Sequence, residues 1–238
     1  MNSVVYKANT RGTADYGWLR ANYSFSFANY FNPDRIQFGV LRVLNDDFIA
    51  PGMGFGTHPH DNMEIVTIPL KGALKHRDSM SHEGVIRPGE VQVMSAGSGL
   101  RHSEMNASHS EETNILQLWI LPEAKDVTPR YDQKMFDKKA KENTFLTVVT
   151  PKDKNDGNAL WIHQQAYFSL GDFSKGSTAS YHLKNKAHGV YLFVIEGQTE
   201  VAGKTLTQRD AISLRDTTSV PINSIKNSKL LLIEIPMN

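Results

Sequence analysis

The sequence of 238 residues contains no cysteine. Disulfide frameworks, cysteine-ligated zinc sites, iron–sulfur clusters and thiol nucleophiles are therefore excluded together, and the composition fits a reducing cytosol. A chain of this length buries well over half of its unfolded surface without a disulfide or metal staple. We expect any metal site to be functional and to use His, Asp and Glu side chains.

An excess of charge and long apolar runs are also missing. The 26 lysines and arginines nearly balance the 25 aspartates and glutamates, and the net charge of +1 gives no electrostatic basis for direct nucleic-acid binding. No apolar run approaches the roughly 18 residues that cross a membrane. Residues 1–17 lack the basic and apolar parts of a signal peptide. We predict a cytoplasmic protein without a membrane partner.

The dominant local pattern is an alternation of apolar and polar residues with a period of two, which is typical of strands. Helical signals are scarce. Because each strand face needs a second sheet to cover it, the pattern predicts an all-β fold, a sandwich or a barrel. The runs with this pattern are separated by turns containing Gly, Pro or Asp and are Ile65–Leu70, Val91–Met94, Asn114–Leu121, Phe145–Val149, Gly189–Ile195 and Leu230–Ile235.

A repeated pattern divides the chain into two lobes. Thr67–Gly72 followed by Ile86–Met94 has a counterpart in Leu192–Gly197 followed by Leu206–Leu214. In each copy a strand ends at a Gly turn and a later turn leads into a second strand. The charged segment 123–143 is predicted to be a helical or coil-like linker. We thus predict two related barrels, in residues 1–122 and 144–238.

Potential ligand residues gather in two motifs, GTHPHDNME at 56–64 and GSGLRHSEMN at 97–106. In an extended strand, residues two apart share a face, so His58 and His60 point the same way, as do His102 and Glu104. If both strands line one barrel, three imidazoles and a carboxylate converge there. Such a set suits Fe(II), Mn(II), Ni(II), Cu(II) or Zn(II) and leaves positions open for substrate or O2. Glu64 has the parity of His58 and His60, so it is an alternative ligand or a hydrogen-bond partner of a ligating imidazole.

These motifs resemble the paired motifs of the cupin superfamily. The spacing is Gly52-x5-His58-x-His60-x3-Glu64-x7-Gly72, then Gly89-x5-Ser95-x-Gly97 and His102-x3-Asn106, with one extra residue before Gly72 and the second His displaced by two. The resemblance narrows to pirin through SFSF at 24–27, GVLRVLNDD at 39–47, APGMGFGTHPH at 50–60 and MSAGSGLRHSE at 94–104. It is strong over residues 15–121 and weaker, though consistent in length and order, beyond them.

The resemblance to pirin implies a bicupin, two antiparallel jelly-roll barrels, whose amino-terminal barrel binds one divalent metal ion. The implied ligands are His58, His60, His102 and Glu104, with Glu64 outside the ligand set, and the implied metal is Fe(II), with Mn, Ni, Cu or Zn as alternatives. Bacterial pirin-like proteins are associated with quercetin 2,3-dioxygenase activity, in which O2 opens a flavonol and carbon monoxide is released. We therefore predict an oxidoreductase for a small aromatic substrate. Its base, the carboxylate that takes the proton of the substrate hydroxyl, is Glu104 or Glu64.

The animal relative implies a different function, that of an iron-dependent co-regulator of transcription factors. The alternative for this chain is therefore a redox-sensing module that binds a protein partner without turnover. Release of carbon monoxide distinguishes the two.

The second lobe is predicted to be a degenerate, structural barrel. An internal alignment places Leu183 and Asn185 opposite His58 and His60, and Ile222 and Ser224 opposite His102 and Glu104, so the four ligand positions are lost. The neighbouring His182 and His188 have no suitably spaced carboxylate. Elsewhere, His76 and His82 are predicted to lie in a surface loop. The aromatic residues Phe25, Phe27, Tyr30 and Phe31 are either core or part of a substrate wall.

Overall fold

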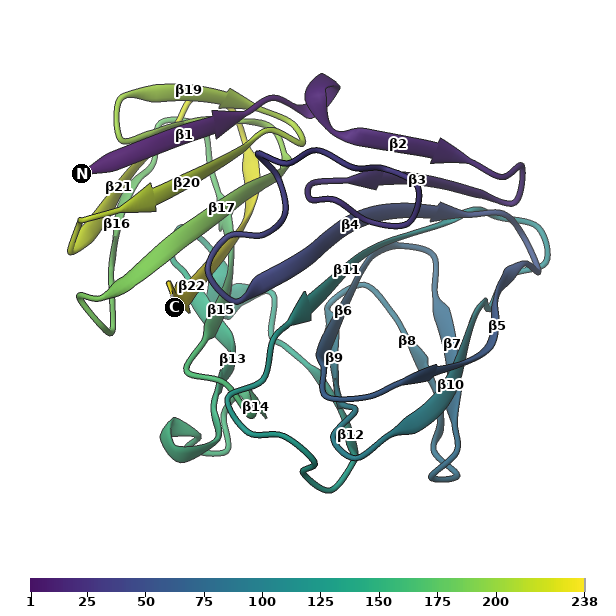
Figure 1. Cartoon of the computed structure of the whole chain (residues 1–238). Helices are drawn as coiled ribbons and strands as arrows, with labels where there is room; N and C mark the ends of the chain where they lie inside the picture. Colours follow the sequence, from purple (N-terminus) through teal and green to yellow (C-terminus); the bar gives the residue numbers. More distant parts are fainter. Residues whose placement is uncertain (238) are drawn as a thin grey trace.

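The computed structural model describes residues 1–237, which form two β-barrels side by side (Figure 1). Each barrel consists of a seven-stranded sheet and a four-stranded sheet. The predicted all-β fold is confirmed, and every run with a period of two overlaps a strand. Within the described residues, helix is limited to the short 3-10 turns η1 (Ala8–Thr10), η2 (Lys139–Lys141) and η3 (Lys152–Lys154), and no helix there is long and apolar enough to cross a membrane.

The amino-terminal barrel combines the sheets β12-β9-β6-β11-β4-β3-β2 and β5-β10-β7-β8. Figure 1 shows them in purple to teal. The strands are β2 (Gly12–Asp15), β3 (Leu19–Tyr23), β4 (Leu41–Ile49), β5 (Gly54–His60), β6 (Glu64–Lys71), β7 (Leu74–Asp78), β8 (Glu83–Ile86), β9 (Glu90–Ser95), β10 (Leu100–Asn106), β11 (Thr113–Ile120) and β12 (Arg130–Met135).

The carboxyl-terminal barrel repeats the central strand order in the sheets β1-β20-β17-β22-β15-β13-β14 and β16-β21-β18-β19, whereas its sheet edges differ, since β1 comes from the amino terminus and β14 pairs with β13 in parallel. Gly72 and Gly197 end equivalent strands, and both have positive φ (72° and 88°), which favours glycine. The strands are β1 (Asn2–Tyr6), β13 (Leu146–Pro151), β14 (Leu160–Ile162), β15 (Tyr167–Phe173), β16 (Thr178–His182), β17 (His188–Glu196), β18 (Gln198–Val201), β19 (Lys204–Thr207), β20 (Ala211–Arg215), β21 (Ser219–Ser224) and β22 (Ser228–Pro236).

The two seven-stranded sheets pack against each other and form the largest apolar cluster. Val66 and Leu116 of the first barrel contribute to it, as do Phe168, Phe193 and Leu231 of the second. Strands in these sheets are buried on both faces, since one face covers the other barrel and the opposite face lines the strand's own barrel. This explains why they read as nearly continuous apolar runs.

The interiors of the two barrels differ. Inside the carboxyl-terminal barrel, large apolar residues such as Phe173, Leu192 and Leu232 fill the space. In the amino-terminal barrel, β4 and β11 instead place polar side chains at inward positions, among them Asp47 and Gln117, and these line a cavity. The site therefore lies in the barrel whose core is interrupted by polar residues.

Two segments differ from the expected organisation. Residues Arg130–Met135 of the predicted linker form β12, which pairs with β9 and extends the first barrel's sheet. The helical or coil-like interpretation is wrong there, because the polar composition belongs to an edge strand rather than to a solvated linker. The amino-terminal strand β1 pairs with β20 of the second barrel. In Figure 1 it lies beside β20, away from the rest of its own lobe.

Candidate metal centre

Strands β5 and β10 bring the two sequence motifs together. They are antiparallel neighbours, and His102 lies opposite His58. The register then shifts, so that Glu104 faces Phe55. Such a bulge adds a residue to one strand of the pair and lets Phe55 and His58, three residues apart, both face the cavity.

The three imidazoles form a compact cluster inside the barrel. The distance between ring centroids is 4.9 Å for His58 and His60, 4.5 Å for His58 and His102, and 4.8 Å for His60 and His102. One nitrogen from each ring lies within 4.8 Å of the others. The carboxylate of Glu104 belongs to an overlapping group with His102 and His76, within the same limit. The three predicted histidines therefore converge in the fold, and Glu104 lies beside one of them, His102.

The protonation of the cluster suits metal binding. Burial lowers the pKa of His102 to about 2, and burial together with His58 lowers that of His60 to about 4. Both rings are therefore neutral, which is the form that binds a metal. The Nδ1 of His58 donates to the carbonyl oxygen of Gly56 at 2.8 Å, which leaves its Nε2 for the site.

Buried atoms without partners provide a test of whether the site fits an ion. Both ring nitrogens of His102 and the Oε1 of Glu104 are buried and have no hydrogen-bond partner in the described chain. The Oε2 of Glu104 accepts from Nε2 of Gln117 at 2.6 Å, and burial raises the pKa of Glu104 to about 7. Unpaired buried polar atoms are costly. A divalent first-row cation would take one nitrogen of His102 and the Oε1 of Glu104, so the donor set fits a metal.

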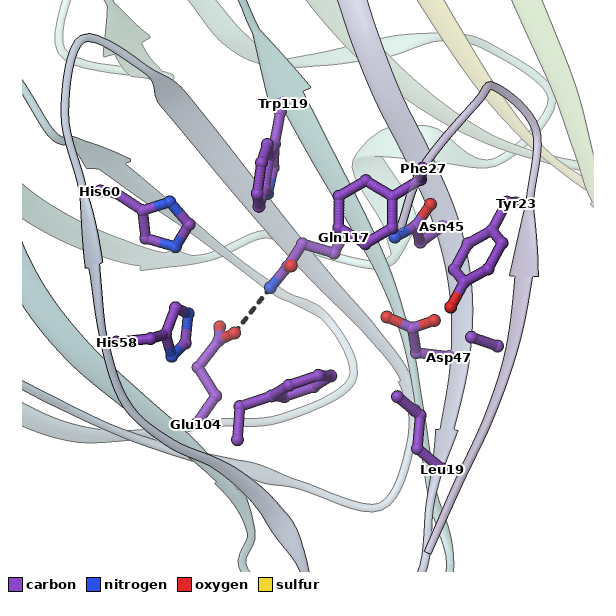
Figure 2. A pocket seen from close by; sticks show the side chains of 12 residues that line it. Leu19, Tyr23, Phe27, Asn45, Asp47, His58, His60, Glu104, Gln117 and Trp119 are labelled. Carbon is purple, nitrogen blue, oxygen red and sulfur yellow. Dashed lines mark hydrogen bonds between the residues drawn. The ribbon is translucent and has the colours of Figure 1, made fainter. Parts of the chain in front are cut away.

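A cavity of about 170 Å³ adjoins the cluster. Figure 2 shows His58 and His60 on one side of it and Asp47 and Tyr23 on the other. Trp119 forms part of the wall, edge-on to the ring of His60 with centroids 4.9 Å apart. The full lining is Leu19, Ala21, Tyr23, Phe27, Asn45, Asp47, Phe55, His58, His60, Glu104, Gln117 and Trp119.

Glu64 does not line this cavity. Its carboxylate accepts from Ser95 Oγ at 2.7 Å and lies 3.3 Å from Nδ1 of His163, which belongs to the second lobe. Burial raises the pKa of Glu64 to about 7. The shared parity of Glu64 with His58 is not informative, because Asn62 with φ of 44° turns the chain between β5 and β6.

His76 is buried, so the prediction of a surface loop is wrong for this residue. It lies on β7 opposite Glu104, and its Nε2 is 3.2 Å from Oδ2 of Asp78. The same oxygen is 3.1 Å from Nδ1 of the half-exposed His82. The sequence signal that was overlooked is the spacing of two residues between Leu74, His76 and Asp78, which places all three side chains on the inner face of a strand.

Of the aromatic residues left open between core and substrate wall, Phe27 lines the cavity, whereas Phe25 packs in the core against Tyr191. Sequence reasoning did not identify Asp47, Gln117 and Trp119 as lining residues. The period of two in β11 places Gln117 and Trp119 on one face, but a polar residue on a strand is ordinarily assigned to the solvent side.

The second barrel has no comparable donor set at equivalent positions. Ile222 pairs with Ala179, as His102 pairs with His58. The counterparts of His58 and His60 are then Ala179 and Tyr181, four residues before those of the sequence alignment. His188 is buried, and its Nδ1 lies 3.1 Å from Oε1 of Glu234. Within residues 1–237, this pair is not part of a group of three or more side chains that could hold a metal ion.

Fold and site together define a bicupin whose amino-terminal barrel holds a histidine and carboxylate cluster beside a cavity. The sequence matches the family described as Pirin over residues 5–120 and that described as Quercetinase C-terminal cupin domain over residues 147–235. The chain belongs to the pirin family. It is 40% identical over 230 residues to the quercetin 2,3-dioxygenase of Escherichia coli K12, with 97% of each chain covered. It is 42% identical to a putative quercetin 2,3-dioxygenase of Zymomonas mobilis, with 93% of each chain covered.

The fold of a solved bacterial pirin agrees with this assignment. A crystal structure of a pirin from Escherichia coli in complex with nickel(II) matches with a TM-score of 0.93 and 37% sequence identity, and the match covers 100% of both chains.

Proposed function

We propose that this protein is a metal-dependent dioxygenase that opens a flavonol such as quercetin with O2 and releases carbon monoxide. The observation that carries the proposal is the cavity beside the imidazole cluster, with aromatic walls and a buried carboxylate at its edge. The names of the full-length relatives support the reaction class. One flavonol and one O2 give one ring-opened product and one carbon monoxide, so no external reductant is needed. A cytoplasmic location stays a prediction.

We further propose that one divalent ion is held by His58, His60, His102 and Glu104. Fe(II) remains our expectation for the metal, and the nickel complex of the relative shows that a pirin can take Ni(II). When bound, the ion would act as a Lewis acid that stabilises a deprotonated substrate hydroxyl, and it would also be a redox-capable centre for the reaction with O2.

The chain's own residues supply binding, orientation and proton transfer. Phe27, Phe55 and Trp119 provide apolar surface for an aromatic ring. Glu104 is the proposed proton acceptor, because it lines the cavity, whereas Glu64 is engaged by Ser95 outside the cavity. Gln117 orients the Glu104 carboxylate through its hydrogen bond.

The experiment is aerobic incubation of the iron-loaded protein with quercetin. We expect loss of the flavonol absorbance and carbon monoxide in equal amounts. The control is His102→Ala, which we expect to remain folded, because the apolar clusters of this barrel do not include His102, but to lose both the metal and the reaction. Bleaching without carbon monoxide, or equal rates for the two proteins, would contradict the proposal.

A further inference from the structure

Asp47 lies at the end of the cavity opposite the imidazole cluster. It is on β4, only 2% exposed, and its Oδ1 is buried without a hydrogen-bond partner in the described chain. Figure 2 shows the carboxyl group turned toward the cavity beside Tyr23, on the side away from His58 and His60. The cavity therefore has an unsatisfied polar end that the proposed metal ligands do not use.

The adjacent Asp46 shows what a structural carboxylate looks like in this strand. Its side chain points to the other face of β4 and lies 3.2 Å from Nη1 of Arg11. It also accepts from Nδ2 of Asn114 at 2.9 Å and lies 3.6 Å from Nη1 of Arg209 in the second lobe. Asp46 thus ties the lobes together. Asp47 has no comparable set of partners, so packing and lobe contact do not account for a carboxyl group at that position.

The cost of this arrangement points to a ligand. Burial of a polar group without a partner destabilises a fold, and such groups persist where a bound molecule completes their hydrogen bonding. Burial, together with the neighbouring Asp46 and Glu104, holds the pKa of Asp47 well above its ordinary value. The protonated carboxyl group that this favours both donates and accepts, and a phenolic hydroxyl has the matching capacity.

The size of the cavity limits what reaches Asp47. A cavity of about 150 Å³ with apolar walls holds a benzene molecule, and this one has a volume of about 170 Å³. A single aromatic ring fits between the walls formed by Leu19, Phe27 and Phe55, and a larger substrate must extend toward the mouth. The chemistry at the far end is therefore that of one ring and its substituents.

We propose that Asp47 binds a phenolic hydroxyl on the substrate ring that enters the cavity, so that the site selects aromatic substrates hydroxylated on a ring remote from the reacting group. This rests on the proposed function for its substrate class. Asn45 and Tyr23 line the cavity on the same side as Asp47 (Figure 2). Asp47 is then a specificity-determining residue.

The test compares two flavonols and three proteins by anaerobic calorimetric titration of the metal-loaded chain, so that binding is measured without turnover. The flavonols are quercetin and 3-hydroxyflavone, which lacks the remote hydroxyls. The proteins are the wild type, Asp47→Leu and the conservative Asp47→Asn. A site that hydrogen-bonds a hydroxyl discriminates against its absence, so we expect Asp47→Leu to lose about 10- to 100-fold in quercetin affinity. The same variant should bind 3-hydroxyflavone within about 3-fold of the wild type.

Asp47→Asn keeps a donor and an acceptor and should retain most of the preference for quercetin. Asp47→Leu should unfold at the wild-type temperature or above it, since it replaces an unpartnered polar group by an apolar one of similar size. A folded Asp47→Leu that still prefers quercetin, or one that does not fold at all, would overturn the role assigned to Asp47.

Turnover separates this inference from the function on which it rests. If carbon monoxide is released but Asp47→Leu still prefers quercetin over 3-hydroxyflavone, only the role assigned to Asp47 is wrong. If the wild type prefers quercetin, Asp47→Leu loses this preference and neither protein releases carbon monoxide, the proposed dioxygenase activity is wrong and the binding role of Asp47 is supported. If the wild type binds neither flavonol, both are wrong.

Discussion

Glu64 and Glu104 are both buried glutamates with a pKa raised to about 7, but their partners differ. Glu104 has a free oxygen beside the imidazoles, and Glu64 is bonded to Ser95 and His163. We predict that Glu104→Gln weakens divalent metal binding by about 100-fold or more, because it removes a charged ligand. Glu64→Gln should change the affinity for the metal by less than about 10-fold. Changes of residues that hydrogen-bond a metal ligand typically have effects of about 10- to 100-fold, and Glu64 has no such contact. Competition against a chelator measures both, and the opposite ranking would assign the ligand role to Glu64.

The titration of Glu64 provides a separate prediction about stability. Its pKa is about 7 in the folded chain against an ordinary value of 4.5, so the protonated form is favoured on folding. The stability contributed by Glu64 is therefore complete below pH 4.5 and is lost as the pH rises through about 7. Glu64→Gln keeps the neutral form at all pH values and should gain in free energy of unfolding relative to wild type over this window, by up to about 3 kcal/mol.

Urea unfolding of the chelator-treated proteins between pH 5 and pH 8 measures this difference. A constant difference between the two proteins across that range would show that Glu64 does not titrate with folding.

At the scale of elements, the strands were predictable where the apolar signal was strong. β6, β17 and β22 lie in the sheets between the barrels, and burial on both faces leaves them a clear apolar signal. β12 was not predicted, because an edge strand covered by polar residues looks like a linker. β1 was not predicted to join the second barrel, since pairing between residues more than 200 positions apart leaves no local trace.

The same reasoning explains what could be predicted of the candidate site. The spacing of His58 and His60 on one strand, and of His102 and Glu104 on another, is a local property that the residues themselves display. Their convergence required the pairing of β5 with β10, which the resemblance to pirin implied and spacing alone did not. His76 and Asp47 come from other strands, β7 and β4, and only the closed barrel reveals that they face the same interior.

On the scale of the whole molecule, the second barrel is joined to the first through a shared apolar cluster, yet its own interior is filled. His188 lies there beside Glu234, which also accepts from Tyr181 Oη at 2.8 Å, whereas His182 is exposed. We predict that replacement of both histidines by Gln leaves one metal ion per chain and lowers the free energy of unfolding by about 1–3 kcal/mol, through the weakened contact to Glu234.

Elemental analysis and thermal unfolding of the double variant measure the two parts of this prediction. For a chain of this size, that loss corresponds to a fall in the unfolding temperature of about 2–12 °C. The single variant His182→Gln is the matched control and should unfold as the wild type does, since its side chain is solvated. The metal should stay because the imidazole cluster and Glu104 all belong to β5 and β10 of the first barrel. A folded double variant without metal would mean that the second barrel supplies a ligand. The second barrel would then take part in metal binding and would not be structural alone.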